Sequence, residues 1–326
     1  SSYESFVQKV QDELQLKTKH NKTSIENLAK KYAILDKTEV KELTELAIVN
    51  EARKIAHKTG WTSDEKFEAI VDLYHSQVNL SHRTSQSILL QQYSTPAPIG
   101  YLAGLFCEID KLETKGDYAF EPSAGNGLLT IAGNPSRIYV NEIDDFRNLN
   151  LQTQGFANVW KRDATNEFFD VHRHFQAVMT NPPFGKINPK IAFNGFEFNT
   201  LDHVMALRAL ETMLEDGRAS IIIGGHTQWD ERGRIQAGKN RIFFNYLHHF
   251  YNVADVLQID GHKLYSRQGT SFNVRMILID GRKEIPQGAS PIYNEHNDKV
   301  IDTFDELYER VIDAMKHIQP TTMKII

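Results

Sequence analysis

Cysteine and long uncharged apolar runs are nearly absent from this chain of 326 residues. The single cysteine, Cys107, excludes an internal disulfide framework and fits a reducing cytoplasm. No apolar run is long enough to cross a membrane, and no signal peptide is recognisable. We therefore expect a cytoplasmic protein that has no membrane partner.

An excess of positive charge is also missing. Lysine and arginine number 37 against 42 aspartates and glutamates, which gives a formal net charge of −5. A protein whose whole surface binds nucleic acid would be basic, so any such contact must be local or supplied by a partner. The 40% hydrophobic and 24% charged residues suit a compact enzyme with a full catalytic core and one smaller element.

Proline is absent from residues 1–85, and glycine nearly so. Apolar side chains recur there at heptad-like spacing, and Thr62-Ser63-Asp64-Glu65 precedes a further apolar series as a capped helix start. This pattern predicts an N-terminal helical domain. Its balanced charges leave three roles open: packing on the catalytic core, clamping nucleic acid, or binding a partner.

The most specific motif in the sequence is Asn181-Pro182-Pro183-Phe184, which follows an apolar run at 175–180 that predicts a short buried strand. The prolines end that strand and fix the backbone. A rigid amide and carbonyl beside an aromatic ring suit a planar heterocycle with an exocyclic amine. Asn181 and the Pro182 carbonyl would accept its two N–H groups, and Phe184 would stack on the ring. A simple turn is the alternative, because Asn-Pro is a common turn starter.

A glycine turn lies upstream, where a strand predicted at 117–121 runs into Gly125 and Gly127 and then into a helix. Glycine allows a tight bend and close approach of the backbone to a ligand, although a lone G-x-G is weak evidence. Two further predicted strands end in acids, Glu142 and Asp163, whose carboxylates suit ribose hydroxyls and an adenine amine. Any one surface acid is more often simply solvated. Four such sites in order at successive strand ends indicate a cofactor site.

With these residues the chain resembles the S-adenosylmethionine-dependent amino-methyltransferases, specifically the N6-adenine DNA methylases of the gamma class, and is similar to type I and IIG modification methylase cores. The segment 91–100, which contains Thr95-Pro96, looks like the N-terminal cofactor motif of that family. Thr95 is equally a candidate N-cap, with Pro96 at the first helical position. The resemblance covers roughly residues 86–282.

The resemblance implies a role for each matched position. Thr95 contacts the methionine portion of the cofactor, and Glu121 and the backbone of 123–127 lie near its amino and carboxylate groups. Glu142 holds the ribose, Ile143 packs on the adenine and Asp163 binds the adenine amine. The implied catalytic residues are Asn181, Pro182, Pro183 and Phe184, where phenylalanine replaces the tyrosine often found last. The implied cofactor residues are Thr95, Glu121, Pro122, Ser123, Ala124, Gly125, Gly127, Glu142, Ile143, Asp163 and Ala164.

The cofactor implied is S-adenosylmethionine, whose methyl group is already activated on a sulfonium. The enzyme then mainly has to align nucleophile, methyl carbon and sulfur. Acceptance of both amine N–H groups at Asn181 and Pro182 favours a more tetrahedral nitrogen and disperses the positive charge that develops. A C5-cytosine methylase would need a nucleophilic thiol, but Cys107 lies in an apolar helical run and is expected to pack.

Contacts to the substrate are expected from three segments beyond the tetrapeptide. Residues 185–198 suggest a mobile loop over the active site, residues 230–241 a basic loop that contacts phosphate, and residues 266–275 a hairpin that lines the base pocket. The alternatives are core packing for the phenylalanines and a solvated run for the charges. The candidate substrate residues are Lys186, Phe196, Arg232, Arg234, Lys239 and Phe272.

The order of motifs predicts an α/β chain with a Rossmann-like, seven-stranded S-adenosylmethionine-dependent methyltransferase domain over residues 86–285. The helical domain precedes it over residues 1–85, and residues 286–326 form a tail with one helix at 302–317. Free-standing gamma-class members usually carry a large target-recognition domain after the core, and none fits here. A separate or fused target-recognition or helicase module is therefore an expected partner. The start at Ser1-Ser2, without methionine, suggests either a cloning scar or an excised piece of a longer chain.

Three functions remain open. The first is N6-adenine methyl transfer to DNA, in duplex form with the adenine flipped out, in a restriction–modification, antirestriction or mobile-element protein. The second is RNA methylation at guanine N2 or adenine N6, which the same tetrapeptide serves, although the Thr95-Pro96 motif favours DNA. The third is a non-catalytic binding module of a larger protein that has kept the fold. No metal is expected, because the histidine pairs at 172/174 and 248/249 lack further ligands.

Overall fold

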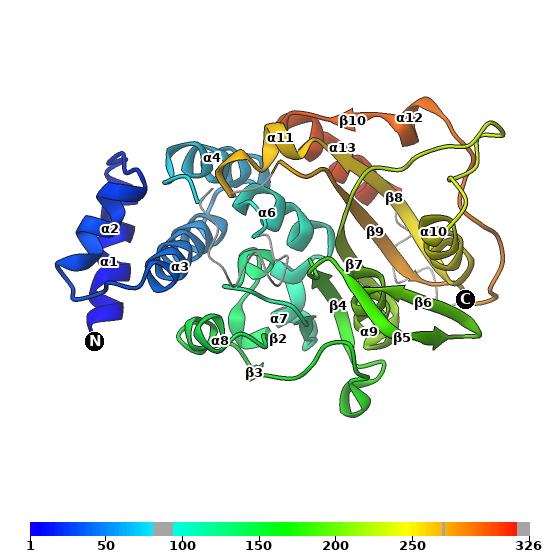
Figure 1. Ribbon diagram of the computed structural model, residues 1–326, viewed down its shortest axis with the longest axis horizontal. Coiled ribbons are helices and arrows are strands. Elements are labelled where there is room, and N and C mark those ends of the chain that lie inside the picture. Colours follow the sequence, from blue (N-terminus) through cyan, green and yellow to red (C-terminus); the bar gives the residue numbers. More distant parts are fainter. Residues whose placement is uncertain (81–93, 269–270, 318–326) are drawn as a thin grey trace.

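The computed structural model of the protein describes residues 1–80, 94–268 and 271–317. One large sheet is flanked by helices, and the N-terminal helices gather at one end of the molecule (Figure 1). Some of the expectations above concern residues outside these ranges. The domain boundary at 85/86, residues 91–93 of the Thr-Pro motif, residues 269–270 of the late segment and residues 318–326 of the tail lie outside the described residues.

The N-terminal segment is helical, as its lack of proline predicts. Thr62 caps the helix that follows it: its hydroxyl accepts the Glu65 N–H at 3.2 Å, and the Glu65 carboxylate accepts the Thr62 N–H at 3.3 Å. The helix expected at 302–317 is also present. The helices are α1 (Ser2–Gln15), α2 (Lys22–Lys30), α3 (Lys37–Ala56), α4 (Ser63–Ser76), α6 (Ala97–Phe106), α7 (Leu112–Lys115), α8 (Asp145–Gln152), α9 (Leu201–Glu211), α10 (Lys239–Phe250), α11 (Gly261–Leu264), α12 (Glu295–Asp298) and α13 (Phe304–Lys316).

The strands confirm the predicted α/β class. They are β1 (Ala119–Glu121), β2 (Ile138–Asn141), β3 (Asn158–Trp160), β4 (Phe175–Thr180), β5 (Lys186–Phe193), β6 (Phe196–Thr200), β7 (Met213–Gly224), β8 (Tyr251–Ile259), β9 (Val274–Arg282) and β10 (Val300–Ile301). The large sheet has the order β10-β8-β9-β7-β4-β1-β2-β3, and only β9 runs antiparallel to its neighbours. It has 8 strands in place of the expected seven. The additional strand is β10, which pairs with the end of β8.

Both faces of this sheet are buried. Along β4, Ala177 and Met179 belong to the hydrophobic core on the face covered by α6 and α13. Val178, between them, belongs to the core on the face covered by α9 and α10. This alternation is the period of two of a strand. Because both faces are covered, residues 177–179 are apolar without alternation, which is why the sequence could predict the strand.

The order of the strands reverses between β1 and β4. The chain runs outward from β1 to β2 and β3 and then returns to β4 on the other side of β1. The loops that follow β1 and β4 therefore run in opposite directions and leave a crevice between them. α/β proteins bind ligands in such a crevice, outside the carboxyl ends of the strands. Glu121, the last residue of β1, and Asn181, the residue after β4, both lie at that edge.

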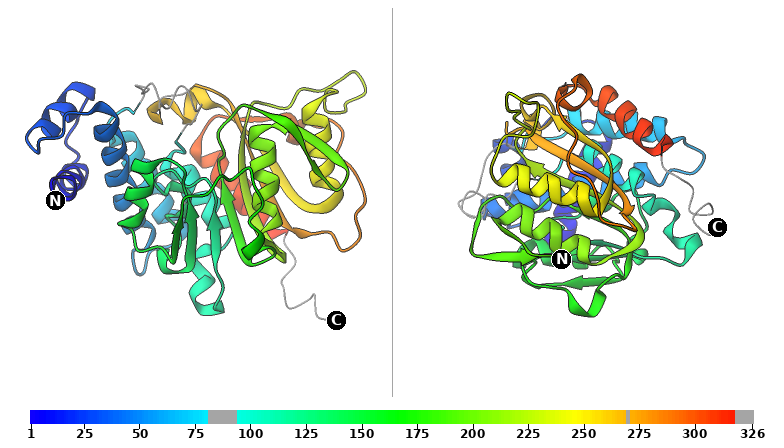
Figure 2. Two further views of the ribbon diagram at one scale, coloured as in Figure 1. Left: turned by 60° about the horizontal axis from the view of Figure 1, so that its bottom comes forward. Right: turned by 90° about the vertical axis from the view of Figure 1, so that its right-hand side faces the viewer.

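The N-terminal helices α1, α2 and α3 share a hydrophobic cluster of their own. Figure 2 shows them at the end of the molecule opposite to the hairpin β5–β6 and α10. α3 also packs on α8, and both α3 and α4 pack on α6, so these two helices border the sheet. No helix among the described residues has the length and apolar character needed to span a bilayer.

The loop expected at 185–198 is instead most of an antiparallel hairpin. Phe193 pairs with Phe196, and the two residues between them form the turn. Asn194 has φ 49° and Gly195 has φ 83°, the left-handed pair that an Asn-Gly hairpin turn requires. This dipeptide is the local signal that identifies the hairpin.

Two shorter elements also differ from the prediction. The helix expected at 128–132 is a single 3₁₀ turn, Leu128–Thr130. The hairpin expected at 266–275 is a 3₁₀ turn, Ser266–Gln268, followed by the start of β9. β9 pairs with β7 and β8, both of which end before residue 266, so its partners lie outside the expected hairpin.

Candidate active site

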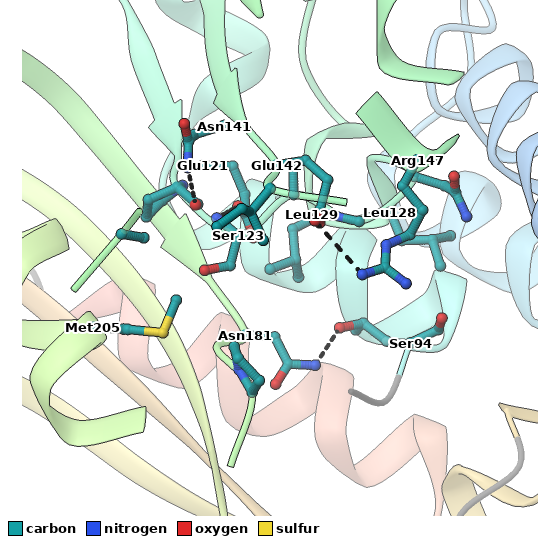
Figure 3. Close-up of a pocket in the computed structure, with 18 of the residues that line it drawn as sticks. Ser94, Glu121, Ser123, Leu128, Leu129, Asn141, Glu142, Arg147, Asn181 and Met205 are labelled. Atoms are coloured by element: carbon teal, nitrogen blue, oxygen red, sulfur yellow. Dashed lines mark hydrogen bonds and ion pairs between the residues drawn. The ribbon is translucent and has the colours of Figure 1, made fainter. Parts of the chain in front are cut away.

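A cavity of about 420 Å³ opens at the point where the strand order reverses. Figure 3 shows Glu121, Glu142 and Asn181 from three strand ends around it, together with Arg147 from α8. They converge because parallel strands end at the same edge of the sheet. The predicted residues that line the cavity are Thr95, Glu121, Pro122, Ser123, Ala124, Gly125, Glu142, Ile143, Asp163, Ala164, Asn181, Pro183, Phe184 and Lys186.

The glycine turn after β1 has a left-handed backbone. Gly125 has φ 56° and Gly127 has φ 101°, and a Cβ on Gly127 would lie 3.0 Å from the Gln154 side chain. The Ala124 N–H donates to the Asn141 carbonyl at 3.0 Å, which ties the turn to the end of β2. The turn therefore presents its backbone to the cavity in one defined shape.

Glu142 follows β2 and is held from two sides. Its Oε1 accepts the Gly125 N–H at 2.8 Å, and its Oε2 accepts the Asp144 N–H at 2.8 Å. Arg147 Nη2 lies 3.5 Å from the same Oε2, and Arg147 Nη1 lies 3.8 Å from Glu42. Burial alone would lower the pKa of Arg147, but Glu142 and Glu42 outweigh it and raise that pKa. The Glu142 carboxylate is therefore held in one position at the cavity wall.

Glu121 is the most deeply buried acid of the site, with 1% of its surface exposed. Its carboxylate accepts the backbone N–H groups of Ser123 and Asn181. Burial raises the pKa of Glu121 well above its usual value, and the nearby Glu142 adds to this rise, while the two N–H groups oppose it. Glu121 thus links the glycine turn after β1 to the tetrapeptide after β4.

The outer rim of the cavity combines an apolar surface with an acceptor. Ile143 is apolar yet 54% exposed. Asp163 is exposed as well, and its Oδ1 accepts the Thr165 N–H at 2.9 Å and the Thr165 hydroxyl at 2.7 Å. These two bonds fix the orientation of the carboxylate. A flat heterocycle could lie on Ile143 and donate to Asp163 at the same time.

Thr95 orients the Asn181 side chain. Asn181 Nδ2 donates to Thr95 Oγ1 at 2.9 Å, and the Thr95 carbonyl accepts Gln268 Nε2 at 3.3 Å. The alternative role of Thr95 as a helix cap is wrong, because α6 begins at Ala97, after Pro96, and its N-terminus has no side-chain cap. The Thr95 hydroxyl instead binds the tetrapeptide.

The rest of the tetrapeptide is fixed by packing. Pro183 and Phe184 line the cavity, whereas Pro182 is buried. The Phe184 ring lies against Gly224 at the end of β7, where a Cβ would come within 3.0 Å of it. A glycine in the neighbouring strand therefore makes room for the ring.

Some predicted residues do not line the cavity. Phe196 is 44% exposed, and its ring meets Tyr246 and Phe250 edge-on, so it packs on α10 instead. Phe272 is 53% exposed. Within the described part of the chain, the predicted site residues outside the cavity lining are Gly127, Pro182, Phe196, Arg232, Arg234, Lys239 and Phe272.

The segment expected as a basic loop at 230–241 ends in a helix, because α10 begins at Lys239, and one internal acid organises it. Asp230 accepts the Arg234 Nε at 3.1 Å and the Arg241 Nη2 at 2.8 Å. It also accepts the backbone N–H groups of Arg232 and Arg234, each at 2.9 Å. The Arg234 and Arg241 side chains are thus already paired, which leaves Arg232 and Lys239 as exposed cations of this segment.

Sequence reasoning missed one wall of the cavity, which the N-terminal helix α3 supplies. Lys41, Glu42 and Glu45 of this helix line the cavity and are at most 9% exposed. Burial and then Glu42 raise the pKa of Glu45 to about 6, and the hydroxyl of Ser94 opposes this rise. Charged residues on a helix usually indicate a solvated face, so the sequence alone did not identify them. The other lining residues that were missed are Ser94, Asn126, Leu128, Leu129, Asn141, Arg147, Arg162, Thr165, Gly185, Leu201 and Met205.

Buried polar bonds hold α3 against the glycine turn. Glu42 accepts Asn126 Nδ2 at 2.7 Å, and Asn126 Oδ1 accepts Asn150 Nδ2 at 2.9 Å. Arg53 donates to the Thr130 carbonyl at 2.9 Å and to Gln154 Oε1 at 2.8 Å. The wall formed by α3 is therefore bound to the same turn that faces the cavity.

Cys107 packs in the core, as expected. It is buried, and its Sγ lies 3.3 Å from Ser220 Oγ, away from the cavity lining. Burial raises the pKa of the Cys107 thiol to about 12, so the nucleophilic thiolate is disfavoured. The described ranges hold no group of three or more His, Cys, Asp and Glu side chains placed to bind a metal ion.

Comparisons by sequence find no counterpart for this chain. No family model matches it. No curated protein matches it either.

Comparison with solved structures does find similar folds. A Listeria monocytogenes protein classed as a class I S-adenosylmethionine-dependent methyltransferase aligns over 97% of this chain and 98% of its own, at 9% identity and a TM-score of 0.52. A chain of a type I restriction–modification system aligns over 91% of this chain and 66% of its own, at 13% identity and a TM-score of 0.51. This chain thus spans about two thirds of that second structure. The protein has the Rossmann-like fold of S-adenosylmethionine-dependent methyltransferases.

Proposed function

We propose that this protein transfers a methyl group from S-adenosylmethionine to the exocyclic N6 amine of adenine in DNA. One observation carries the proposal: the acids at the ends of β1 and β2 and three residues of the tetrapeptide after β4 line the same cavity. A cofactor bound by these acids and an amine bound by the tetrapeptide would therefore lie next to each other. The order of the motifs, with the glycine turn before the tetrapeptide, is that of the gamma-class N6-adenine methylases that the sequence resembles.

The cavity wall fits a cofactor that carries positive charge. S-adenosylmethionine has a sulfonium and an ammonium against a single carboxylate, so it is attracted to an acidic site. The carboxylates of the wall are Glu42, Glu45, Glu121, Glu142 and Asp163. The Ser123 hydroxyl is buried and makes no hydrogen bond with a described residue, so a ligand can use it. A volume of about 420 Å³ lies within the usual range for a cofactor pocket.

Each part of the cofactor has residues that suit it. Glu142 would bind the ribose hydroxyls, and Ile143 and Asp163 would hold the adenine. Glu121 and the glycine turn would face the methionine portion. When bound, the cofactor supplies a methyl group that is already activated for transfer.

The tetrapeptide would hold the target amine. With its nitrogen bound to Thr95, the Asn181 amide directs its oxygen, an acceptor, at the amine. The Pro182 carbonyl accepts the second N–H, and Phe184 stacks on the base. Two acceptors stabilise the positive charge that develops on nitrogen during attack, so no strong base is needed before transfer.

Adenine in DNA is the preferred substrate because the segment around Thr95-Pro96 is similar to a motif of the DNA enzymes. An adenine in duplex DNA can reach this cavity only when it leaves the helix. Lys186 lies at the tetrapeptide end of the cavity and is exposed, so it can contact a phosphate next to the flipped base. The residues assigned above bind the cofactor and the target base, and reading of the neighbouring sequence is left to the proposed partner, a target-recognition or helicase module that is separate or fused.

The experiment that tests this function measures transfer of a labelled methyl group. The protein is incubated with labelled S-adenosylmethionine and duplex DNA, single-stranded DNA or RNA, and the product nucleosides are identified by mass after digestion. N6-methyl-2′-deoxyadenosine from DNA is the expected product. Label in guanine N2 or adenine of RNA would move the assignment to RNA. Cofactor binding without transfer to any nucleic acid would favour a non-catalytic binding module.

Asn181→Ala is the variant that tests the catalytic assignment. We expect methyl transfer to fall by about a hundred-fold or more, because a preorganised hydrogen bond to the reacting group is lost. Cofactor affinity, measured by calorimetry, should stay within about twofold, since Asn181 is not required for the ribose and adenine contacts. Asn252→Ala, at an exposed asparagine, is the matched control. Full transfer by Asn181→Ala would refute the assignment.

A further inference from the structure

Four cations line the cavity: Lys41, Arg147, Arg162 and Lys186. Arg147 is paired with Glu142 and Glu42. Arg162 makes a bidentate pair with Asp170, at 2.7 and 2.9 Å. Both arginines therefore have their charge compensated by the protein itself.

Lys41 differs from these arginines. It is only 9% exposed, lies on α3 and faces the cavity. Its charge acts on Glu45 and opposes the rise of the Glu45 pKa, but within the described ranges no hydrogen bond or ion pair reaches its ammonium group. An ammonium that is removed from most of the solvent and left without a partner is costly, unless a bound group compensates it. Lys186, in contrast, is exposed on β5 and remains hydrated.

We propose that Lys41 binds the α-carboxylate of the cofactor's methionine portion. This assignment rests on the proposed function, since it concerns the same cavity. The carboxylate is the one anionic group of S-adenosylmethionine, and Lys41 is the one buried cation of the described cavity lining that the protein leaves unpaired. A charge-assisted hydrogen bond would satisfy both groups.

The position of Lys41 on the helix supports this assignment. Lys41 and Glu45 are four residues apart, so they lie on the same face of α3, and both line the cavity. Glu45 accepts the Ser94 hydroxyl at 2.6 Å, and Ser94 precedes Thr95, which binds Asn181. This face of α3 therefore adjoins the tetrapeptide side of the cavity, where the methionine portion must lie for its methyl group to reach the amine.

One turn of α3 thus presents a cation and an anion to the cavity. An amino acid group carries the complementary pair, a carboxylate and an ammonium. A phosphate of the substrate has only negative charge and would meet Glu45 and Glu42 as well as Lys41. The zwitterion is therefore the better match.

The test compares two ligands that differ only in the carboxylate. Calorimetry measures the affinity of the full chain for S-adenosylmethionine and for decarboxylated S-adenosylmethionine. Lys41→Met keeps the length of the side chain and its helix propensity but removes the charge. We expect it to weaken S-adenosylmethionine binding by about ten- to a hundred-fold and to change binding of the decarboxylated ligand by less than about twofold.

Lys37→Met is the matched control, because Lys37 lies one turn earlier on α3 and is exposed. Its affinities should equal those of the unchanged protein. Lys41→Gln, which is neutral but polar, should repeat the effect of Lys41→Met and serves if that variant folds poorly. Lys41→Arg should restore preference for the carboxylate ligand.

The outcomes separate this inference from the proposed function. Unchanged S-adenosylmethionine affinity in Lys41→Met would overturn the inference and leave the cofactor assignment intact. An equal loss for both ligands would also overturn it, because the lysine would then act on the pocket and not on the carboxylate. If the unchanged protein bound neither ligand, the proposed function would fail together with the inference.

Discussion

At the scale of single residues, the hydrogen bond between Asn181 and Thr95 decides which end of the amide faces the cavity. An asparagine amide has a donor end and an acceptor end, and only the acceptor end suits an amine. Because Thr95 Oγ1 accepts the Asn181 nitrogen at 2.9 Å, the contact proposed between Asn181 and the amine falls to the amide oxygen. The resemblance assigned Thr95 to the methionine portion of the cofactor, so the two roles make different predictions.

Thr95→Val keeps the shape of the side chain and removes the hydroxyl. We expect the rate of transfer at saturating cofactor to fall by about ten- to a hundred-fold, as for loss of one well-placed hydrogen bond. Cofactor affinity should change by less than about threefold, and Thr95→Ser should restore most of the rate. Single-turnover transfer and calorimetry measure the two quantities. Weaker cofactor binding with an unchanged rate would instead support the contact with methionine.

At the scale of secondary-structure elements, α3 combines two roles. Its apolar residues belong to the hydrophobic clusters of the N-terminal helices and of the sheet. Its charged residues Lys41, Glu42 and Glu45 line the cavity. The helix is therefore buried on several sides and part of the candidate site. We propose that the N-terminal helical segment is required for cofactor binding.

The pH dependence of cofactor binding tests this role of α3. Burial and Glu42 raise the pKa of Glu45 to about 6, so this carboxyl is neutral at pH 5 and charged at pH 7. A positively charged cofactor prefers the charged form. The affinity for the cofactor should therefore rise from pH 5 to pH 7. The rise is roughly tenfold if the charge of Glu45 contributes about 1.4 kcal/mol to cofactor binding.

Glu45→Gln is the control for this prediction. It removes the titrating group and keeps an acceptor for the Ser94 hydroxyl. Calorimetry at several pH values should then give a flatter profile than that of the unchanged protein. An identical profile in Glu45→Gln would show that the pH dependence has another source.

At the scale of the whole molecule, buried polar bonds join the N-terminal helices to the sheet. Arg53 of α3 donates to the Thr130 carbonyl at 2.9 Å, to the Thr130 hydroxyl at 2.9 Å and to Gln154 Oε1 at 2.8 Å. Removal of the arginine leaves all three acceptors without this donor. Unsatisfied buried acceptors are costly, so the two parts should unfold together.

Arg53→Met should therefore lower the free energy of unfolding by about 2–4 kcal/mol. Urea denaturation followed by tryptophan fluorescence and by circular dichroism measures this change, and coincident transitions would indicate one cooperative unit. Lys37→Met is the control, since Lys37 is an exposed cation at the start of the same helix. A loss below about 0.5 kcal/mol in Arg53→Met would contradict the proposed coupling.

The fold and one side of the candidate site could be predicted because their signals are local. The apolar run at 175–180 is β4 itself, and Glu121, Glu142 and Asn181 stand directly at strand ends. The hairpin β5–β6 also had a local signal, the Asn194-Gly195 turn. Its phenylalanines are divided between core and surface, since Phe198 is 4% exposed and Phe196 is 44% exposed. The packing of the hairpin on the rest of the protein decides which phenylalanine is buried, and the spacing of the phenylalanines in the sequence does not.

The sequence by itself determined the α/β class and the order of the motifs, and it suggested the chemistry proposed for Asn181 to Phe184, because strand periodicity and residue type act locally. Tertiary structure alone decided which residues share the cavity with them. Glu42 meets Asn126 across 84 positions of sequence, and Asn181 meets Thr95 across 86. Such contacts arise from the packing of α3 and α6 on the strand ends. A charge on a helix has the same appearance in the sequence whether it faces water or a cofactor, and packing chooses between the two.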